Sequence, residues 1–168
     1  MSWLASCKSR TDAATDLVHF LSSESVAVPP VIAELSFHFA QGVNNMRPPL
    51  RILYAEDYKL LLRYVKEMLE DQGWRVEACT DGDLALEAIE GGNIYDLLIL
   101  DNSLPGMTGL ELVRRARRLT HRRRTPIIML SASNAAKAAR YAGVNAFLRK
   151  PDEIDALIET VRRLAGEY

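Results

Sequence analysis

The sequence predicts an α/β protein in which five strand–helix units form a parallel sheet with helices on both faces. From about residue 50 onward, short apolar runs alternate with segments of helical periodicity, which is the pattern of successive βα units. Two runs, 97–100 and 127–130, are apolar at every position, as expected of central strands buried on both sides. These observations indicate a doubly wound sheet.

The first predicted strand is 52–55, and the helix after it shows apolar residues on one face, namely Leu61, Tyr64, Val65, Met68 and Leu69. Gly73 is placed to end that helix. Residues 74–79 alternate between apolar and polar, which predicts a half-buried edge strand. Residues 83–90 then form the second predicted helix, closed by Gly91-Gly92.

The second half of the domain continues the alternation. After the strand at 97–100 and a Pro-Gly turn, a helix is predicted over 108–119. The strand at 127–130 leads to a short Ala-rich helix over 135–141, and 146–148 is the fifth strand. The last helix has an amphipathic stripe made by Ile154, Leu157, Ile158, Val161 and Leu164.

The chain changes character at Met46-Arg47-Pro48-Pro49. Before this point lie a Ser-rich stretch, the Pro29-Pro30 break and little core-forming pattern. We therefore expect residues 1–48 to be a loosely structured, dispensable extension, which a translation start at Met46 would omit, and residues 49–168 to form the folded domain. The competing interpretation is a docking arm, because alternating Leu35, Phe37 and Phe39 suit a strand that pairs with a partner's edge.

Composition excludes several classes of protein. The formal net charge is −1, from 21 Lys and Arg against 22 Asp and Glu, so the overall balance does not call for nucleic acid or an anionic membrane. Cys7 and Cys79 have no metal-like spacing and indicate a reducing compartment. The sequence shows neither a run of about 18 apolar residues nor the layout of a secretory signal. We expect a cytoplasmic location and no membrane contact.

Polar residues follow the apolar runs, and the carboxyl ends of parallel strands lie along one edge of a sheet, where ligands bind. The first run ends in Glu56-Asp57, the third in Asp101, the fourth in Ser131 and the fifth in Lys150. The second ends in Thr80-Asp81, without obvious chemistry, which fits an edge strand.

Three carboxylates and one ammonium at this edge would carry a local charge near −2. A divalent cation relieves such repulsion, and carboxylates with carbonyls and waters suit Mg²⁺. The Ser131 hydroxyl and the Lys150 ammonium are suited to hold an oxyanion. A carboxylate in this setting can act as a nucleophile and form an acyl phosphate.

Through these residues, the chain resembles the response-regulator receiver family over residues 50–165. The resemblance rests on motifs in the right order, which are Glu56-Asp57, Leu100-Asp101, Leu104-Pro105-Gly106-Met107-Thr108-Gly109, Ser131-Ala132 and Lys150-Pro151. It implies a flavodoxin-like sheet in the order 2-1-3-4-5. It also implies a phosphoacceptor signalling domain of a two-component phosphorelay.

The resemblance further implies a role for each site residue. Asp101 accepts a phosphoryl group from a phosphohistidine of a sensor histidine kinase or a histidine phosphotransfer protein. Mg²⁺ is the cofactor, held by Glu56, Asp57, Asp101 and the backbone carbonyl of Ser103. Ser131 and Lys150 bind the phosphoryl oxygens, and Ser131 and Phe147 form a switch that alters binding to a downstream protein. The Lys150-Pro151 bond is expected to be cis, and the chain is expected to promote only its own phosphorylation and dephosphorylation.

Other functions were weighed against this one. A phosphatase of the haloacid-dehalogenase type needs a second Asp two residues after the nucleophile, where this chain has Ser103. A flavin or nucleotide binder needs a phosphate-cradling loop after the first strand, where Glu56-Asp57 would repel phosphate. A receiver-like interaction module that is never phosphorylated is the remaining alternative. No DNA-reading module is expected, because the sequence ends at Tyr168.

Two further features of the sequence leave their role in the protein open. Seven arginines lie at the end of the third helix and in the loop after it, namely Arg114, Arg115, Arg117, Arg118, Arg122, Arg123 and Arg124. This position favours a solvated basic face, and the alternative is a patch that binds an anionic partner. Only 18 residues separate Ser131 from Lys150, so the fourth helix is short. We hypothesise that phosphorylation acts mainly by ordering residues 132–144.

Overall fold

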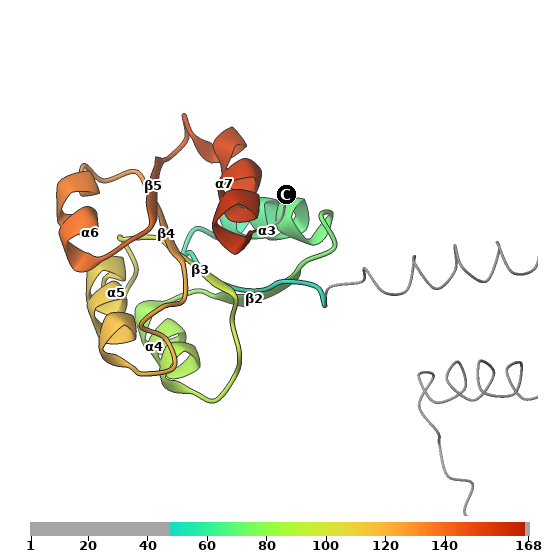
Figure 1. The fold of residues 1–168 in the computed structure, drawn as a ribbon. Coiled ribbons are helices and arrows are strands. Elements are labelled where there is room, and N and C mark those ends of the chain that lie inside the picture. The colour runs from blue at the N-terminus through green and yellow to red at the C-terminus, as the bar shows by residue number, and fades with distance from the viewer. Residues whose placement is uncertain (1–47, 167–168) are drawn as a thin grey trace, which may run out of the picture. The chain divides into compact units, whose positions relative to one another are not determined.

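Five short apolar runs pair into one parallel sheet in the order β2-β1-β3-β4-β5, as predicted (Figure 1). The computed structural model describes residues 48–166. The strands are β1 (Arg51–Ala55), β2 (Arg75–Cys79), β3 (Leu97–Leu100), β4 (Ile127–Ser131) and β5 (Ala146–Arg149). Every residue of β3 and β4 is buried, because helices cover both faces of these central strands.

The helices divide between the two faces of the sheet, which makes the fold doubly wound (Figure 1). On one face lie α3 (Lys59–Glu70) and α7 (Leu157–Ala165). On the other lie α4 (Gly82–Glu90), α5 (Gly109–Arg118) and α6 (Ala136–Ala142). Ile154 was predicted to belong to the apolar stripe of the final helix, but Ile154–Ala156 forms the 3₁₀ turn η1 and α7 follows it.

Local signals in the sequence set several helix boundaries near the site. Asp81, which had no predicted chemistry, caps α4 by accepting a hydrogen bond from the backbone N–H of Leu84 at 2.8 Å. Thr108 and Glu111 form a reciprocal capping box at the start of α5. Gly143 ends α6 with a φ of +102°, a left-handed conformation that favours glycine.

Two residues lie elsewhere than their sequence patterns indicated. Tyr64 was expected on the apolar face of α3, but its side chain is 53% exposed. Arg122 belongs to the arginine run expected on a solvated face, yet it is only 3% exposed. Its guanidinium donates to the carbonyls of Ile89 and Asn93 and stacks over the ring of Tyr95, 4.8 Å from the centroid. The solvated-face interpretation is therefore wrong for Arg122.

Some predictions fall outside the part of the chain that the structure describes. They concern Cys7, Met46, the alternating Leu35, Phe37 and Phe39, and the extension as a whole. Within the described part, Cys79 has a buried free thiol, and burial raises its pKa to about 11. No helix among residues 48–166 has the length and hydropathy needed to span a membrane.

Candidate functional site

The polar residues that follow four strands meet at one edge of the sheet, as predicted. Backbone hydrogen bonds extend the strand pairing just far enough to fix three of them. The backbone N–H of Glu56 donates to the carbonyl of Cys79 at 3.0 Å, and that of Asp101 donates to the carbonyl of Ala55 at 3.0 Å. The backbone N–H of Lys150 donates to the carbonyl of Ser131 at 3.1 Å. Their positions are therefore set by the rigid sheet rather than by the loops.

Lys150 joins the two buried carboxylates. Its Nζ donates to Oε2 of Glu56 and to Oδ2 of Asp101, each at 2.7 Å. Glu56 is 1% exposed and Asp101 is 4% exposed. Ion pairs this sheltered from water are screened little by salt, and charge-assisted hydrogen bonds of this length are strong. The Lys150-Pro151 bond is cis, as predicted.

Burial and the ammonium act in opposite directions on this cluster. Burial raises the pKa of Glu56, and the hydrogen bond from Lys150 offsets only part of that rise. Burial disfavours the charged form of Lys150, but its hydrogen bonds to Asp101 and Glu56 outweigh this effect and raise its pKa. One ammonium is thus shared by two carboxylates, and the site has an excess of negative charge.

The residues present fit a divalent cation. Carboxylate oxygens of Glu56, Asp57 and Asp101 lie within 4.8 Å of one another, and Asp57 is exposed, which leaves the group open to solvent. Oδ1 of Asp101 is buried and has no hydrogen-bond partner among the described residues. A buried carboxylate oxygen without a partner is costly, and a cation with oxygen ligands would satisfy it.

Ser131 lies at the end of β4 and is fully buried. Its hydroxyl is 3.1 Å from the hydroxyl of Ser133 and accepts from the Ser133 N–H at 3.3 Å. Asn102 extends this chain: its Nδ2 donates to Ser133 Oγ at 3.5 Å and its Oδ1 accepts from the Leu110 N–H at 3.2 Å. A polar chain therefore connects the end of β4 to the loop after Asp101.

The remaining predicted residues lie around the edge of this cluster. Ser103 is exposed in the loop after β3, two residues past Asp101. Phe147 lies on β5, paired with Met129 of β4, and packs half-buried against the core beneath α4, α5 and α6. The hydrogen bonds that join Glu56, Asp101 and Lys150 do not include either residue.

Tyr54 is a site residue that the sequence reasoning missed. It is fully buried in β1, and its hydroxyl donates to Oε2 of Glu56 at 3.3 Å. Tyr54 was taken as a plain apolar strand residue. The signal was its spacing, because residues two apart on a strand point to the same face of the sheet. A phenol two residues before Glu56 was therefore placed to reach that carboxylate.

The fold and this acidic edge define a receiver domain of two-component systems. The sequence profile of the response regulator receiver domain matches residues 52–162, and the chain belongs to that family. The chemotaxis protein CheY of Pseudomonas aeruginosa is 32% identical over 119 residues, which cover 68% of this chain and 95% of that protein. The fold and the family predicted from the sequence are confirmed.

Other relatives are longer. Transcriptional regulatory protein TcrA of Mycobacterium tuberculosis is 35% identical over 119 residues, 69% of this chain but 46% of that protein. The chain thus spans about half the length of this relative.

Solved structures show the same fold. One is the receiver domain of a sensor histidine kinase from Pseudomonas aeruginosa, which has a magnesium ion coordinated in its active site cleft. It matches with a TM-score of 0.65 and 30% sequence identity, and the match covers 71% of this chain and 100% of that one. The response regulator TrrA of Thermotoga maritima, in complex with Mg²⁺ and BeF, matches with a TM-score of 0.61 at 31% identity over 68% and 98%.

Proposed function

We propose that Asp101 accepts a phosphoryl group from a phosphohistidine and that Mg²⁺ is required. The observation that carries this proposal is the buried carboxylate of Asp101, with Oδ2 bound to Lys150 and Oδ1 without a partner in the described part of the chain. Glu56 shares the ion pair with Lys150 and the acidic group, but both of its carboxylate oxygens have hydrogen-bond partners, whereas Oδ1 of Asp101 has none in the described part of the chain.

The transfer needs one nucleophile and neutralisation of charge. A carboxylate oxygen of Asp101 forms the new bond to phosphorus, and the phosphorus–nitrogen bond breaks. With its second ring nitrogen protonated, the imidazole keeps the electron pair of that bond and leaves as neutral histidine. Lys150 already lies 2.7 Å from Asp101, so its ammonium is positioned to pair with an oxygen of the incoming group.

Glu56, Asp57 and Asp101, with the backbone carbonyl of Ser103, would hold the Mg²⁺. When bound, the ion supplies positive charge that offsets the carboxylates and the phosphoryl oxygens. The Ser131 hydroxyl, at the neighbouring strand end, would donate to another phosphoryl oxygen. In turning toward that oxygen it would leave its contact with Ser133, 3.1 Å away, and so alter the polar chain to the Asp101 loop.

The donor would be a sensor histidine kinase or a histidine phosphotransfer protein, and the output would be a change in binding to a downstream protein, with Phe147 following Ser131. We place the protein in the cytoplasm, where its phosphodonor and reduced thiols would be found. Its only catalysis would be its own phosphorylation and dephosphorylation. Phosphoacceptance explains the orphaned Asp101 oxygen, which a purely structural interaction module does not need.

The test uses the full chain with acetyl phosphate and Mg²⁺, followed by intact-mass analysis. The expected result is one added phosphoryl group that is stable in acid and labile in base. Asp101→Asn should add none, whereas Asp152→Asn, at an exposed aspartate outside the acidic group, should behave as wild type. Equal addition to Asp101→Asn, or none to the wild type, would show that Asp101 is not the acceptor.

A further inference from the structure

Positive charge is concentrated on one part of the domain. Residues 109–145 hold nine Lys and Arg residues against a single acidic residue, Glu111, a formal charge of +8. The whole chain has a net charge of −1, so the remaining residues carry −9. Basic residues in the last turns of α5 and α6 complement the helix dipoles, but this does not account for Arg114 in the middle of α5 or Lys137 near the start of α6.

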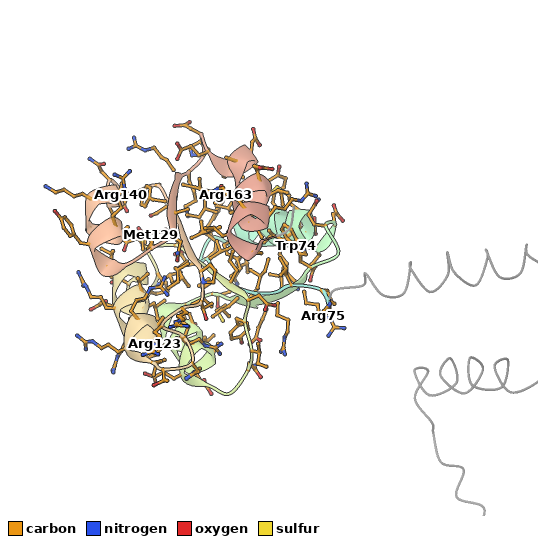
Figure 2. The ribbon with its side chains drawn as sticks, viewed as in Figure 1. Trp74, Arg75, Arg123, Met129, Arg140 and Arg163 are labelled. Carbon is orange, nitrogen blue, oxygen red and sulfur yellow. The ribbon has the colours of Figure 1, made fainter. Side chains whose placement is uncertain are left out.

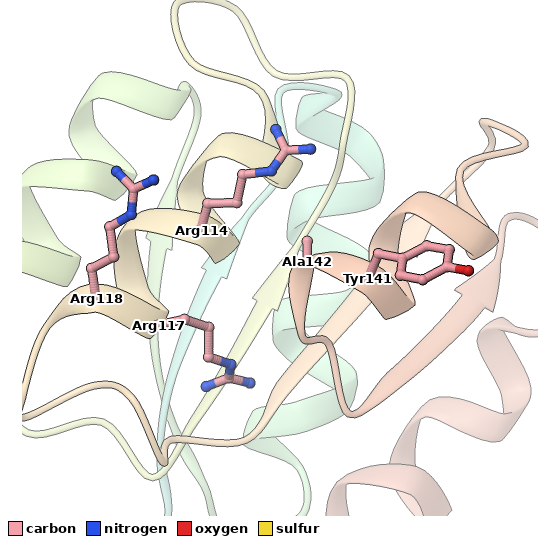
Figure 3. Close-up of a pocket in the computed structure, with 5 residues that line it drawn as sticks. All are labelled: Arg114, Arg117, Arg118, Tyr141 and Ala142. Carbon is pink, nitrogen blue, oxygen red and sulfur yellow. The ribbon is translucent and has the colours of Figure 1, made fainter.

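A cleft lies between the two basic helices. It has a volume of about 450 Å³ and is lined by Arg114, Arg117, Arg118, Tyr141 and Ala142 (Figure 3). We call it the α5–α6 cleft. None of these residues belongs to the acidic edge around Asp101. Tyr141 is 83% exposed, more than the other exposed tyrosines of the described part, Tyr58 at 60% and Tyr64 at 53%, so its ring is accessible to a ligand in the cleft.

Arg117 connects the two helices that line the cleft, α5 and α6. Its Nε and one terminal nitrogen donate to Gly143 O at 2.9 and 2.7 Å, and other donors reach Thr125 O at 2.7 Å and Asn145 Oδ1 at 2.8 Å. A Cβ at Gly143 would lie 3.2 Å from Arg117 Nε, so glycine allows this close approach. The C-terminal end of α6 is thereby tied to α5.

These bonds hold the positive charge of Arg117 in the lining of the cleft. Arg117 has no carboxylate partner among residues 48–166, and burial lowers its pKa without removing its charge. Its donors are used by carbonyls, so it supplies an attractive field but few free hydrogen bonds. A cleft held open by internal contacts does not have to be ordered when a ligand enters.

Arg114 and Arg118 supply the free donors. They lie one turn apart on α5, are exposed, and form no ion pair with any carboxylate in the described part of the chain. The nearby Glu111 is held by Thr108, whose N–H and hydroxyl donate to it at 2.9 and 2.6 Å. Arg114 is also attracted by Glu111, whose pKa is lowered by the hydrogen bonds from Thr108 and by the charge of Arg114, while Arg114 and Arg118, four residues apart on the helix, repel each other.

We propose that the α5–α6 cleft binds an acidic segment of a partner protein. Two carboxylates of that segment pair with Arg114 and Arg118, and an apolar side chain between them packs on Tyr141 and Ala142. Arg and Tyr are the residue types that carry most of the binding energy at protein interfaces. Binding here is separate from phosphorylation, because none of these residues takes part in the acidic edge.

The charge distribution favours a short protein segment over a nucleic acid. The basic surface covers two helices of 10 and 7 residues. Outside residues 109–145 the chain carries −9, which would repel the continuing phosphates of a long polyanion. Arg140 is exposed on α6, next in sequence to Tyr141 of the cleft, and adds to the positive charge of this helix (Figure 2).

The test measures fluorescence anisotropy of a labelled helical peptide with two glutamates one turn apart and a leucine between them, added to the full chain at about 150 mM salt. Saturable binding is expected. Arg114→Ala/Arg118→Ala should weaken it about tenfold and Tyr141→Ala about fivefold. The matched control is Arg123→Ala/Arg124→Ala, which removes the same charge from exposed residues outside the cleft and should weaken binding less than about threefold.

Phosphorylation of Asp101 by acetyl phosphate should be the same in all these variants, which shows that they are folded. Three results would overturn the proposal. The first is no anisotropy change with the wild type. The second is an equal loss in the two double variants, which would mean general charge attraction. The third is displacement of the peptide by a single-stranded thymidine oligonucleotide more readily than by unlabelled peptide, which would identify a nucleic-acid surface.

Discussion

The hydroxyl of Tyr54 donates to Oε2 of Glu56 at 3.3 Å, the same oxygen that accepts from Lys150 at 2.7 Å. Burial and the neighbouring Glu56 raise the pKa of Tyr54, so this phenol stays protonated and acts as a donor. The carboxylate of Glu56 is thus held from two sides, by a neutral donor from within the core and by an ammonium from β5. Tyr54 orients a residue that we propose as a metal ligand.

Tyr54→Phe should therefore weaken Mg²⁺ binding more than it weakens the fold. Loss of one hydrogen bond to a carboxylate costs about 1 kcal/mol of unfolding free energy. Mg²⁺ affinity, measured by isothermal titration calorimetry, should fall about tenfold, as when other partners of metal ligands are removed. The control is Tyr64→Phe, at an exposed tyrosine on α3, which should change neither. Unchanged affinity in Tyr54→Phe would mean that the hydroxyl serves only the core.

Lys150→Met should make stability depend strongly on Mg²⁺. The change leaves two buried carboxylates without their shared partner, and breaking such a pair costs about 3 kcal/mol. The ion would replace the lost positive charge, so urea unfolding should show a larger Mg²⁺ stabilisation in the variant than in wild type. Lys66→Met, at an exposed pair with Glu70, should change stability by less than about 0.5 kcal/mol. Equal Mg²⁺ effects in both proteins would contradict this account.

Gly109→Ala should damage the site through the backbone. A Cβ at Gly109 would overlap the carbonyl of Asp101, because α5 begins directly against the loop that follows β3. The loop would have to shift, so we expect a loss of about 2 kcal/mol in stability and slower phosphorylation of Asp101. Gly92→Ala is the matched control, since open space surrounds that glycine. The readouts are urea unfolding and the rate of mass increase with acetyl phosphate.

A chain beginning at Met46 should fold and accept phosphate as the full chain does. Every residue proposed for the site lies between Tyr54 and Lys150, and the family profile begins at residue 52. Equal rates of phosphorylation in the two chains, with equal melting temperatures, are expected. A truncated chain that fails to fold, or that reacts more slowly, would show that residues 1–45 support the receiver domain.

The segment 132–144 should exchange its amide hydrogens faster than the rest of the domain. It contains α6, which has seven residues, no side-chain cap at its start, and only Ala139 fully buried. Exchange should be fastest toward the start of α6, because Arg117 holds its end at Gly143.

Beryllofluoride with Mg²⁺, a mimic of the phosphoryl group, should slow exchange in this segment without producing a dimer. Hydrogen exchange with mass spectrometry measures the first effect and light scattering the second. Protection equal to that of β3 before the mimic is added, or a clean dimer after it, would show that phosphorylation acts in another way.

The family resemblance predicted the strand order, and the apolar runs predicted the strand ends at which Glu56, Asp101 and Lys150 lie. The sequence did not predict the contacts of Tyr54, since an apolar pattern describes a face and not the atom at the tip of a side chain. For the same reason it misplaced Tyr64, whose helical spacing suited the core although its side chain is mostly exposed.

The arginine run shows that charged residues, too, cannot be placed from the sequence pattern alone. Local charge and helix position cannot distinguish a solvated guanidinium from one enclosed by carbonyls, because the enclosing groups come from elsewhere in the chain. Arg117 reaches Asn145 and Arg122 reaches Ile89, which are 28 and 33 residues away. Such long-range contacts became visible only in three dimensions.

Burial of the guanidinium also makes neighbouring arginines differ in how well they tolerate substitution during evolution. Arg122 fills its place with a planar guanidinium that bonds to carbonyls while it stacks on Tyr95, and the compact ammonium of lysine cannot do both. Arg123 and Arg124 are exposed, so lysine, glutamine or serine would serve there equally well; Figure 2 shows Arg123 on the surface. Among related sequences, the identity of residue 122 should therefore be inherited unchanged while its two neighbours drift, although all three look alike in a single sequence.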